Sequence, residues 1–216
     1  MSASLLDWRT GRALLSIDDR VAMPTASLGR ILLLIEVSAR LTARDAAGFG
    51  ILERSAMDDA AGAGLWRHPQ APVLPLVDLA VLVGALGDDL ASNTLLRQIG
   101  LEKVRARTES LGLVTTSLLD RVRDSRGPDD APHPSVGAAA ELTWLLTALS
   151  RGQIVDHTTS RRALDWLGHG VDLLEGPRGG IAYALTVRFA DTSLARRREV
   201  LGAMRVFGLD LLEHVA

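Results

Sequence analysis

The chain has 216 residues, 47% of them hydrophobic, which is long and apolar enough for one well-packed unit of mixed helices and strands. Its 24 basic and 26 acidic residues leave a formal net charge of −2, so composition provides no general attraction to nucleic acid or to an anionic membrane. Cysteine is absent, which excludes disulfides, thiolate metal sites and cysteine nucleophiles.

Further absences narrow the class of protein. The N-terminus lacks a basic segment followed by a long apolar run and a cleavage site, and no uninterrupted apolar stretch approaches about 18 residues. We therefore expect a soluble, cytoplasmic protein that does not enter a membrane. The 5 histidines are scattered without a paired ligand spacing, and no glycine-rich phosphate loop occurs, so we expect no metal and no cofactor.

The first elements in the chain are two predicted strands. Ser4 to Asp7 and Ala13 to Ile17 flank a turn that contains Gly11, a pattern typical of a β-hairpin.

Ser27 follows a turn of small residues that begins at Pro24 and precedes a run, Ile31 to Val37, that is almost wholly apolar. The run predicts a helix that is buried on most of its sides. Ser27 at the mouth of this helix has two interpretations. It is either an N-cap, whose side chain accepts a backbone N–H, or a nucleophile whose Oγ lies in the positive end of the helix dipole.

Trp66 lies near the end of a segment, Ala43 to Pro72, that is rich in Ala, Gly, Asp and Arg and predicts short helical turns and loops. Its side chain either walls a ligand pocket or packs the loop onto the core, as large aromatic side chains commonly do.

The middle of the chain is predicted to be mostly helical. We expect helices over Leu76 to Leu86, Leu90 to Ile99 and Leu101 to Leu111. Asp88 and Asp89 precede the second of these helices, a position where Asp is a preferred cap.

A long loop is predicted from Leu113 to Pro134, where aspartates and arginines are concentrated between Asp120 and Asp130. The aspartates either supply a catalytic base or pair with the arginines and staple the loop. Such pairs contribute little individually when they are exposed.

The last third of the chain is predicted to contain helices over Val136 to Leu149 and Ser160 to Leu167, then a β-hairpin of Val171 to Leu174 with Ile181 to Phe189. Asp191 to Ala216 predicts a long closing helix. Its inward side chains are expected to be the following apolar residues: Leu194, Val200, Leu201, Met204, Phe207, Leu211 and Leu212.

Two of these stretches resemble motifs of the class A serine β-lactamases and penicillin-recognising peptidases. Ser27-Leu28-Gly29-Arg30 resembles the Ser-x-x-Lys motif that opens a buried helix in that family. Gly87-Asp88-Asp89 occupies the place of the family's Ser-Asp-Asn triplet. The helix, Arg-Gly turn and following helix from Leu149 to Leu167 also resemble the family, so the likeness covers nearly the whole chain.

The resemblance also shows where this chain departs from the family pattern. Arg30 replaces the motif lysine, and arginine stays protonated, so it cannot accept a proton. Gly87 and Asp89 replace Ser and Asn. The loop Glu that activates the deacylating water has no counterpart between Ser110 and Pro134, and the one lysine of the chain, Lys103, lies in no Lys-Thr-Gly triplet. Only about three residues join the helix that ends at Leu167 to the predicted hairpin, too few for the strand that carries that triplet in the family.

The resemblance implies an α+β fold, with a mostly antiparallel sheet flanked by helices and an inserted all-helical lobe. We expect one domain, with the sheet lobe at 1–36 and 168–216 and the helical lobe at 37–167. One edge strand is missing, which leaves Val171 to Leu174 as a new sheet edge where a second copy can pair. A homodimer is therefore predicted, and no nucleic-acid or membrane partner.

Three functional hypotheses remain, and whether the protein is an enzyme stays open. In the first it is a serine hydrolase or acyl-transferase that uses Ser27 as nucleophile, Asp88 or Asp89 as a substitute base and Arg30 as an electrostatic clamp. In the second it is a pseudoenzyme that binds a small molecule or a partner in the cleft between the lobes, with Trp66 as a candidate ligand contact. In the third, Arg30 and the two aspartates serve an isomerisation or cyclisation.

Overall fold

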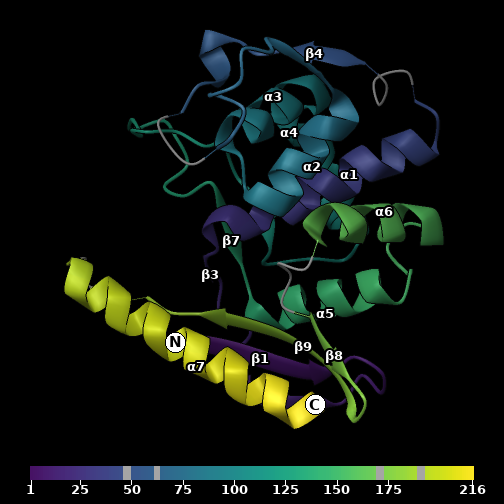
Figure 1. Cartoon of the computed structure of the whole chain (residues 1–216), viewed down its shortest axis with the longest axis vertical. Coiled ribbons are helices and arrows are strands. Elements are labelled where there is room, and N and C mark those ends of the chain that lie inside the picture. The colour runs from purple at the N-terminus through teal and green to yellow at the C-terminus, as the bar shows by residue number, and fades with distance from the viewer. Residues whose placement is uncertain (46–49, 61–63, 169–172, 189–192) are drawn as a thin grey trace. The chain divides into compact units, whose positions relative to one another are not determined.

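The computed structural model of the chain describes residues 1–45, 50–60, 64–168, 173–188 and 193–216. It is an α+β structure (Figure 1) that divides into two compact units. Unit 1 comprises Met1–Met23, Ala138–Thr147 and Asp172–Ala216, and unit 2 comprises Pro24–Gly137 and Ala148–Val171.

The strands and helices follow one another along the chain, with η for 3-10 helices: β1 (Ser2–Asp7), β2 (Ala13–Ile17), β3 (Met23–Pro24), η1 (Ala26–Gly29), α1 (Arg30–Thr42), β4 (Ile51–Glu53), η3 (Ala56–Asp58), β5 (Val73–Pro75), α2 (Leu76–Leu86), α3 (Asp89–Ile99), α4 (Leu101–Ser110), β6 (Ser117–Leu118), β7 (Ser135–Gly137), α5 (Ala139–Ser150), α6 (His157–Leu167), β8 (Leu173–Gly176), β9 (Gly179–Thr186) and α7 (Leu194–Val215).

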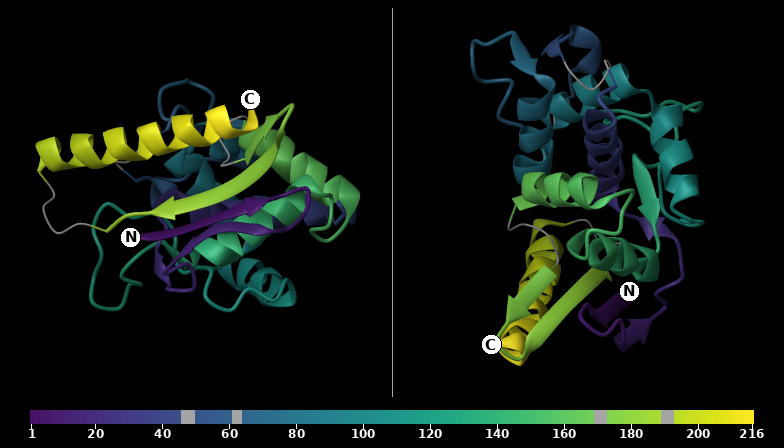
Figure 2. Two further views of the ribbon diagram at one scale, coloured as in Figure 1. Left: turned by 90° about the horizontal axis from the view of Figure 1, so that it is seen from below. Right: turned by 90° about the vertical axis from the view of Figure 1, so that its right-hand side faces the viewer.

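Unit 1 is built on an antiparallel sheet with the strand order β2-β1-β9-β8. Leu5 in β1 lies opposite Leu15 in β2 and Tyr183 in β9. The sheet therefore consists of the N-terminal and C-terminal hairpins, as predicted. Figure 2 shows α7 running along this sheet.

The two faces of the sheet carry different side chains because strand residues alternate between faces. Leu5 and Ile181 face α7 and form an apolar cluster with Val215 at the end of that helix. Ser4, the neighbour of Leu5, faces the other way, and its Oγ lies 2.9 Å from Thr143 Oγ1 of α5. Unit 1 thus has α7 on one face of the sheet and the first turns of α5 on the other.

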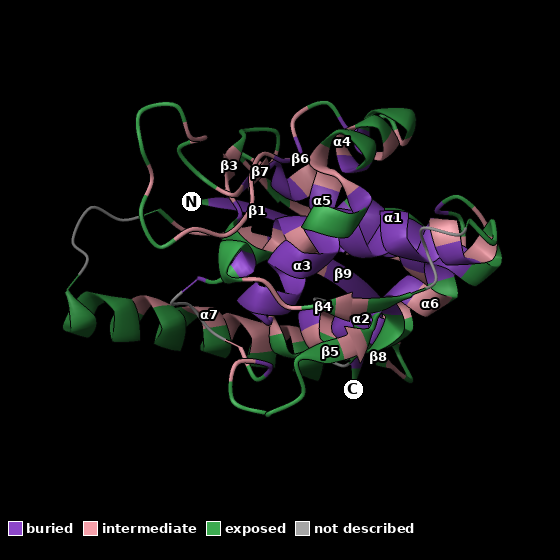
Figure 3. Ribbon diagram, turned by 90° about the horizontal axis from the view of Figure 1, so that it is seen from above, coloured by how far each residue is buried: buried purple, intermediate pink, exposed green. Residues whose placement is uncertain are grey.

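The structure corrects the prediction for the last helix. Leu194, Leu201 and Leu212, which were expected to face inward, are 65%, 64% and 45% exposed. Phe207 and Leu211 do pack against the sheet cluster, as predicted. The inner side of α7 and the sheet also line a mostly apolar pocket of about 370 Å³ that is open to solvent on one side. Figure 3 shows α7 almost entirely as exposed and intermediate surface.

Unit 2 is organised around α1, which is buried from Ile31 to Ala39 and is purple in Figure 3. It packs against α2, α3, α4 and α6. The charge of the buried Glu36 is compensated by Arg40 of the same helix and Arg107 of α4, each donating a 2.8 Å hydrogen bond to it. The prediction of a helix buried on most sides is confirmed.

The other predicted helices are present, but the short strands β3 to β7 were not predicted: β4 pairs with β5, and β6 lies in the segment expected to be a loop. The helix expected from Val136 begins at Ala139, because Ser135–Gly137 forms β7 and pairs with β6. Pro24 to Glu36 groups with the helical unit rather than with the sheet, since α1 packs on other helices.

Some predicted features lie outside the described residues. These are the ends of the last hairpin and the start of the last helix, namely Val171, Asp172, Phe189 and Asp191. Of the described helices, none is both long enough and apolar enough to span a membrane.

Candidate functional site

Ser27 lies in η1, the single 3-10 turn that leads into α1, and it is exposed. It is not an N-cap, because Thr25 precedes η1 and Gly29 is the N-cap residue of α1. Within the described part of the chain, the Ser27 hydroxyl has no hydrogen-bond partner. Its side chain is therefore available to a ligand at the N-terminal end of a buried helix, the positive end of its dipole.

The backbone around Ser27 is held by Ser135 of β7. The Ser135 hydroxyl donates to the carbonyl of Ala26 at 2.8 Å and lies 2.8 Å from the Thr25 hydroxyl. Gly29 permits this approach, because a Cβ at that position would come within 2.3 Å of Ser135 Cβ. Ala26 has φ = +48°, a left-handed conformation that costs a non-glycine residue of the order of 1 kcal/mol. Strain of this kind often occurs at functional sites.

Arg30, at the first position of α1, points back across the start of α3. One guanidinium nitrogen donates to the carbonyl of Gly87 and another forms an ion pair with Asp89. The Arg30 and Asp89 side chains are only 13% and 8% exposed. Gly87 has φ = +62° and ends α2, and a Cβ there would lie 3.0 Å from an Arg30 nitrogen. The arginine thus occupies space beside position 87 that a side chain would otherwise need.

Asp88 has a different set of partners. It is completely buried, and one carboxylate oxygen accepts the backbone N–H of Ala91 at 2.9 Å, which caps α3. The other oxygen accepts the backbone N–H of Trp66 at 2.7 Å. The capping interpretation of Asp88 is confirmed. The carboxylate also ties the loop that carries Trp66 to α3.

Trp66 is 1% exposed, and its indole N–H donates to the carbonyl of Ala71 at 3.1 Å. A side chain this deeply buried offers almost no surface to a ligand. The structure therefore supports the packing interpretation of Trp66 over that of a pocket wall.

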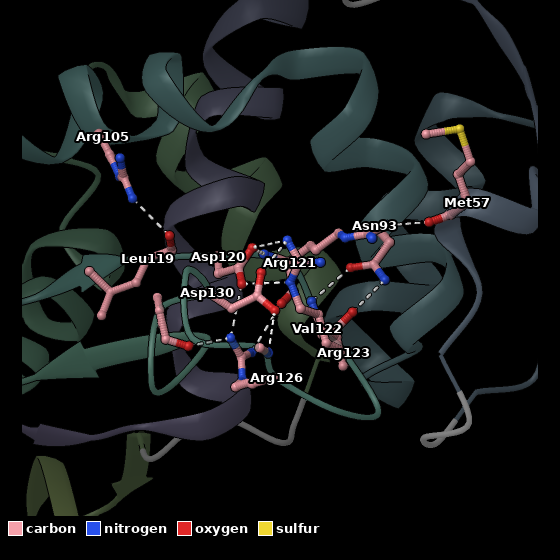
Figure 4. A network of polar contacts seen from close by, with 12 residues as sticks. Met57, Asn93, Arg105, Leu119, Asp120, Arg121, Val122, Arg123, Arg126 and Asp130 are labelled. Atoms are coloured by element: carbon pink, nitrogen blue, oxygen red, sulfur yellow. Dashed lines mark hydrogen bonds and ion pairs between the residues drawn. The ribbon is translucent and has the colours of Figure 1, made fainter.

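The loop after β6 is stapled by an acidic and basic network (Figure 4). Arg123 and Arg126 donate to Asp120 at 2.8 and 2.9 Å, and Arg123 also pairs with Asp130 at 3.1 Å. Burial acts to raise the pKa of the Asp120 carboxyl, but the hydrogen bonds from Arg123, Arg126 and the Arg121 backbone outweigh it and hold this pKa below its usual value. The staple interpretation of this loop is confirmed for Asp120 and Asp130 with Arg123 and Arg126, whereas the Arg121 side chain donates to the carbonyl of Met57.

Asn93 of α3 is a site residue that the sequence did not single out. Its amide nitrogen donates to the carbonyl of Val122, and its amide oxygen accepts the Val122 N–H, both at 2.9 Å. Asn93 therefore fixes the stapled loop against α3. The sequence offers no signal that distinguishes it, since Asn93 lies between two other polar residues, Ser92 and Thr94, of a predicted helix.

A small cavity lies between α1, α3 and the stapled loop. Its volume is about 20 Å³, which accommodates about one water molecule. Its lining includes both polar and apolar residues: Ala26, Arg30, Leu33, Ser92, Asn93, Leu96, Leu118, Asp120, Arg121, Val122 and Pro134.

The structure thus brings Arg30 and Asp89 into direct contact and leaves Ser27 exposed on the adjoining turn. In the described residues, neither Asp88 nor Asp89 hydrogen-bonds to Ser27. No group of three or more histidine or acidic residues that could hold a metal ion occurs in the described ranges.

Comparisons with known proteins agree with this architecture. A family model described as the beta-lactamase enzyme family matches residues 1–175. A comparison of the sequence with curated proteins finds no match.

Several solved structures have a similar fold. A beta-lactamase from Sphaerobacter thermophilus superposes with a TM-score of 0.73 at 21% identity, over 85% of this chain and 80% of that one. A class A beta-lactamase from Mycobacterium abscessus gives 0.70 at 16% identity, over 96% and 93%. A variant of the last common ancestor of Gram-negative class A beta-lactamases gives 0.74 at 18% identity, over 99% and 93%. At these identities the likeness is one of fold.

Proposed function

Because this chain belongs to the beta-lactamase enzyme family, we propose that it is a β-lactamase-like serine hydrolase homologue in which β-lactam hydrolysis is weak or lost. The position of the nucleophile is retained as Ser27, and the proton-transfer groups around it are replaced. The exposed turn that carries Ser27, outside the small cavity beside Arg30, then serves to bind a small molecule or a partner rather than to turn a substrate over.

The observation that carries this proposal is the ion pair between Arg30 and Asp89. A serine hydroxyl is a weak nucleophile at neutral pH unless a neighbouring group takes its proton. Arg30 stands at the family's lysine position and cannot take it. Asp89 is already paired with Arg30, and both oxygens of Asp88 accept backbone N–H groups. Groups that act as a unit lose most of their effect when one is removed, and here several are replaced.

A second candidate, slow acylation of Ser27, is favoured by one observation. The serine is exposed, and the residue before it adopts the strained conformation described above. An accessible hydroxyl at a helix N-terminus can still react slowly with an activated carbonyl or phosphonate.

The proposal is tested by measuring hydrolysis of a chromogenic β-lactam, together with intact-protein mass spectrometry after exposure to β-lactams and a fluorophosphonate probe. We expect hydrolysis no faster with the unmodified protein than with Ser27→Ala. Ser125→Ala, which alters an exposed serine of the stapled loop, is the matched control. Sustained hydrolysis that Ser27→Ala abolishes and Ser125→Ala preserves would overturn the proposal. A stable adduct that Ser27→Ala removes, without turnover, would support the second candidate.

A restoration experiment makes the test sharper. The combined substitutions Arg30→Lys, Gly87→Ser and Asp89→Asn return three motif positions to the family pattern without leaving an unpaired buried carboxylate. If Ser27 is unreactive because these groups are replaced, its acylation should be at least about tenfold faster in this variant. A positioned proton acceptor contributes roughly 10²-fold or more to the rate of such a step. A folded triple variant with unchanged reactivity would contradict that assignment.

A further inference from the structure

The first half of α7 and the sheet of unit 1 leave a pocket between them. Its described lining residues all belong to unit 1: Met1, Ala3, Leu15, Ile17, Leu185, Val187, Arg196, Glu199, Val200, Ala203, Met204 and Phe207. Under the second half of α7, the space between helix and sheet is filled by the apolar cluster around Leu5 and Ile181. The pocket is therefore the part of the core of unit 1 that the described side chains do not fill.

Small side chains explain why this space stays open. Ala3 of β1 and Ala203 of α7 line the pocket, whereas Leu5 of β1 and Leu211 of α7 pack in the filled half. Each alanine leaves space that a leucine would occupy, and the neighbouring apolar walls then remain in contact with water. The volume of about 370 Å³ is within the range of small-molecule sites. A ligand that buries apolar surface here would complete the core.

The dimensions of the pocket suit a slender ligand. The lining residues of α7 extend from Arg196 to Phe207, about 16 Å along a helix axis. A volume of about 370 Å³ spread over that length has a cross-section on the order of 20 Å², about the width of one extended alkyl chain. Phe207 is the only aromatic residue among the described lining residues, so an aromatic ligand would find little to stack on.

The two charged lining residues, Arg196 and Glu199, lie in the first two turns of α7, at the end of the pocket away from the core cluster. Arg196 Nη1 donates to Glu199 Oε2 at 2.7 Å, and the two side chains are 45% and 67% exposed. Such an exposed pair contributes little, so a carboxylate held by its own buried tail can replace Glu199 as the acceptor. Arg197 adds a second positive charge, while Arg188 and Asp18 at the nearby strand ends offset each other. The charges therefore favour an anionic head group.

We propose that this pocket binds a single-chain carboxylic acid, with its alkyl chain between α7 and the sheet and its carboxylate on Arg196. The chain supplies most of the affinity because its methylene groups leave water, and the head group fixes its direction. The pocket lies wholly in unit 1, whereas Ser27 belongs to unit 2. Binding here therefore does not depend on the function proposed for Ser27.

The site is tested by isothermal titration of the full chain with dodecanoate below its micelle concentration. Ala203→Trp places a large side chain in the pocket and should weaken binding at least about tenfold. Ala195→Trp makes the same change at an exposed position of α7 outside the lining and should alter binding less than about twofold. No binding by the unmodified chain, or an effect of Ala203→Trp no larger than that of Ala195→Trp, would overturn the proposal.

The head group is tested by comparing dodecanoate with dodecanol and dodecyltrimethylammonium, which share the chain but are neutral and cationic. Dodecanoate should bind most tightly. Arg196→Gln should weaken its binding about fivefold and leave that of dodecanol within about twofold. Arg198→Gln is the control, because this arginine projects from the opposite side of α7. Tighter binding of either other amphiphile, or equal effects of the two substitutions, would overturn the assignment of the carboxylate to Arg196.

The position of the ligand is also testable without any substitution, which matters if Ala203→Trp does not fold. A ligand between α7 and the sheet stabilises the closed form of the first half of the helix by mass action. Amide hydrogens from Val200 to Met204 should therefore exchange at least about tenfold more slowly in saturating dodecanoate than without it, as measured by mass spectrometry. Unchanged exchange in this segment at saturation would overturn the proposed site.

Discussion

The guanidinium of Arg30 has partners on two of its nitrogens in surroundings that admit little water. Its ion pair with Asp89 joins two side chains that are each more than four-fifths buried, and its other bond goes to the carbonyl of Gly87. Removing a single member of such a pair leaves a buried charge without compensation, which costs far more than the net value of the pair. The ion pair between Arg30 and Asp89 therefore stabilises the start of α3.

This argument predicts a strong coupling between Arg30 and Asp89. Arg30→Met should lower the free energy of unfolding by about 3 kcal/mol or more, while Arg30→Met combined with Asp89→Asn should cost less than the two single changes together. Urea denaturation of the double-mutant cycle measures the difference. The exposed pair Glu102 and Arg105 on α4 is the control, and its coupling should stay near about 0.3 kcal/mol. Equal coupling in the two pairs would refute the idea.

Sequence reasoning found these residues individually but could not find their contact. Arg30 and Asp89 were identified because they stand at motif positions of a resembled family. Their pairing spans 59 residues, and only packing of α1 against α3 brings them together. Ser135 and Asn93 were missed because they act on backbone groups far away in the chain, for which a single sequence carries almost no signal.

At the scale of elements, the loop between β6 and β7 shows how an irregular segment can be held in one conformation. Asp120 accepts hydrogen bonds from two arginines, and the Asn93 side chain accepts one from the backbone N–H of Val122. Because both ends of this network are partly buried, it contributes more to stability than the surface ion pairs of the chain do. The loop that lines the small cavity beside Arg30 is consequently ordered by its own charges.

The depressed pKa of Asp120 gives this staple a pH dependence. A carboxyl whose native pKa lies below its unfolded value stabilises the fold above the unfolded pKa, about 3.9, and loses that contribution as pH falls through the native pKa. The difference in unfolding free energy between the wild type and Asp120→Asn should therefore be full near neutral pH and shrink below about pH 4. Urea denaturation across that range measures it. The control Asp129→Asn, at an exposed position of the same loop, should show no such trend. If the difference between the wild type and Asp120→Asn grew as the pH fell, the prediction would be wrong.

Regular elements were predictable from the sequence wherever a local pattern decides them. The helix expected over Leu76 to Leu86 has those bounds in the structure, since a short apolar run between a proline and a glycine leaves few alternatives. β7 was missed because its two-residue partner β6 lies in a loop, and pairing over that distance leaves no periodic signal. The prediction of which residues of α7 face inward was wrong in part, because the helix has apolar residues on two sides. A single sequence does not indicate which side meets the sheet.

At the scale of the molecule, the two units differ in how completely they bury their helices. In unit 2, α1 is enclosed by other helices along most of its length. In unit 1, α7 is fixed mainly at its C-terminal end, where Arg178 of the β8–β9 turn donates to the carbonyl of Ala216 at 2.9 Å and its backbone N–H donates to that of Val215 at 3.2 Å. The first half of the helix lies over the mostly apolar pocket and has no comparable anchor among the described residues.

This difference predicts how local stability should vary along α7. Segments with few buried contacts open at low free energy, and well-anchored segments open only at a higher cost. Amide hydrogens from Val200 to Met204 should therefore exchange rapidly. Those near Leu211, which is anchored by the sheet and by Arg178, should exchange more slowly. Hydrogen exchange followed by mass spectrometry measures both segments. Arg178→Ala should remove most of the difference, because it deletes the side-chain hydrogen bonds that hold the C-terminal end of α7; equal exchange of the two segments in the unmodified protein would contradict the prediction.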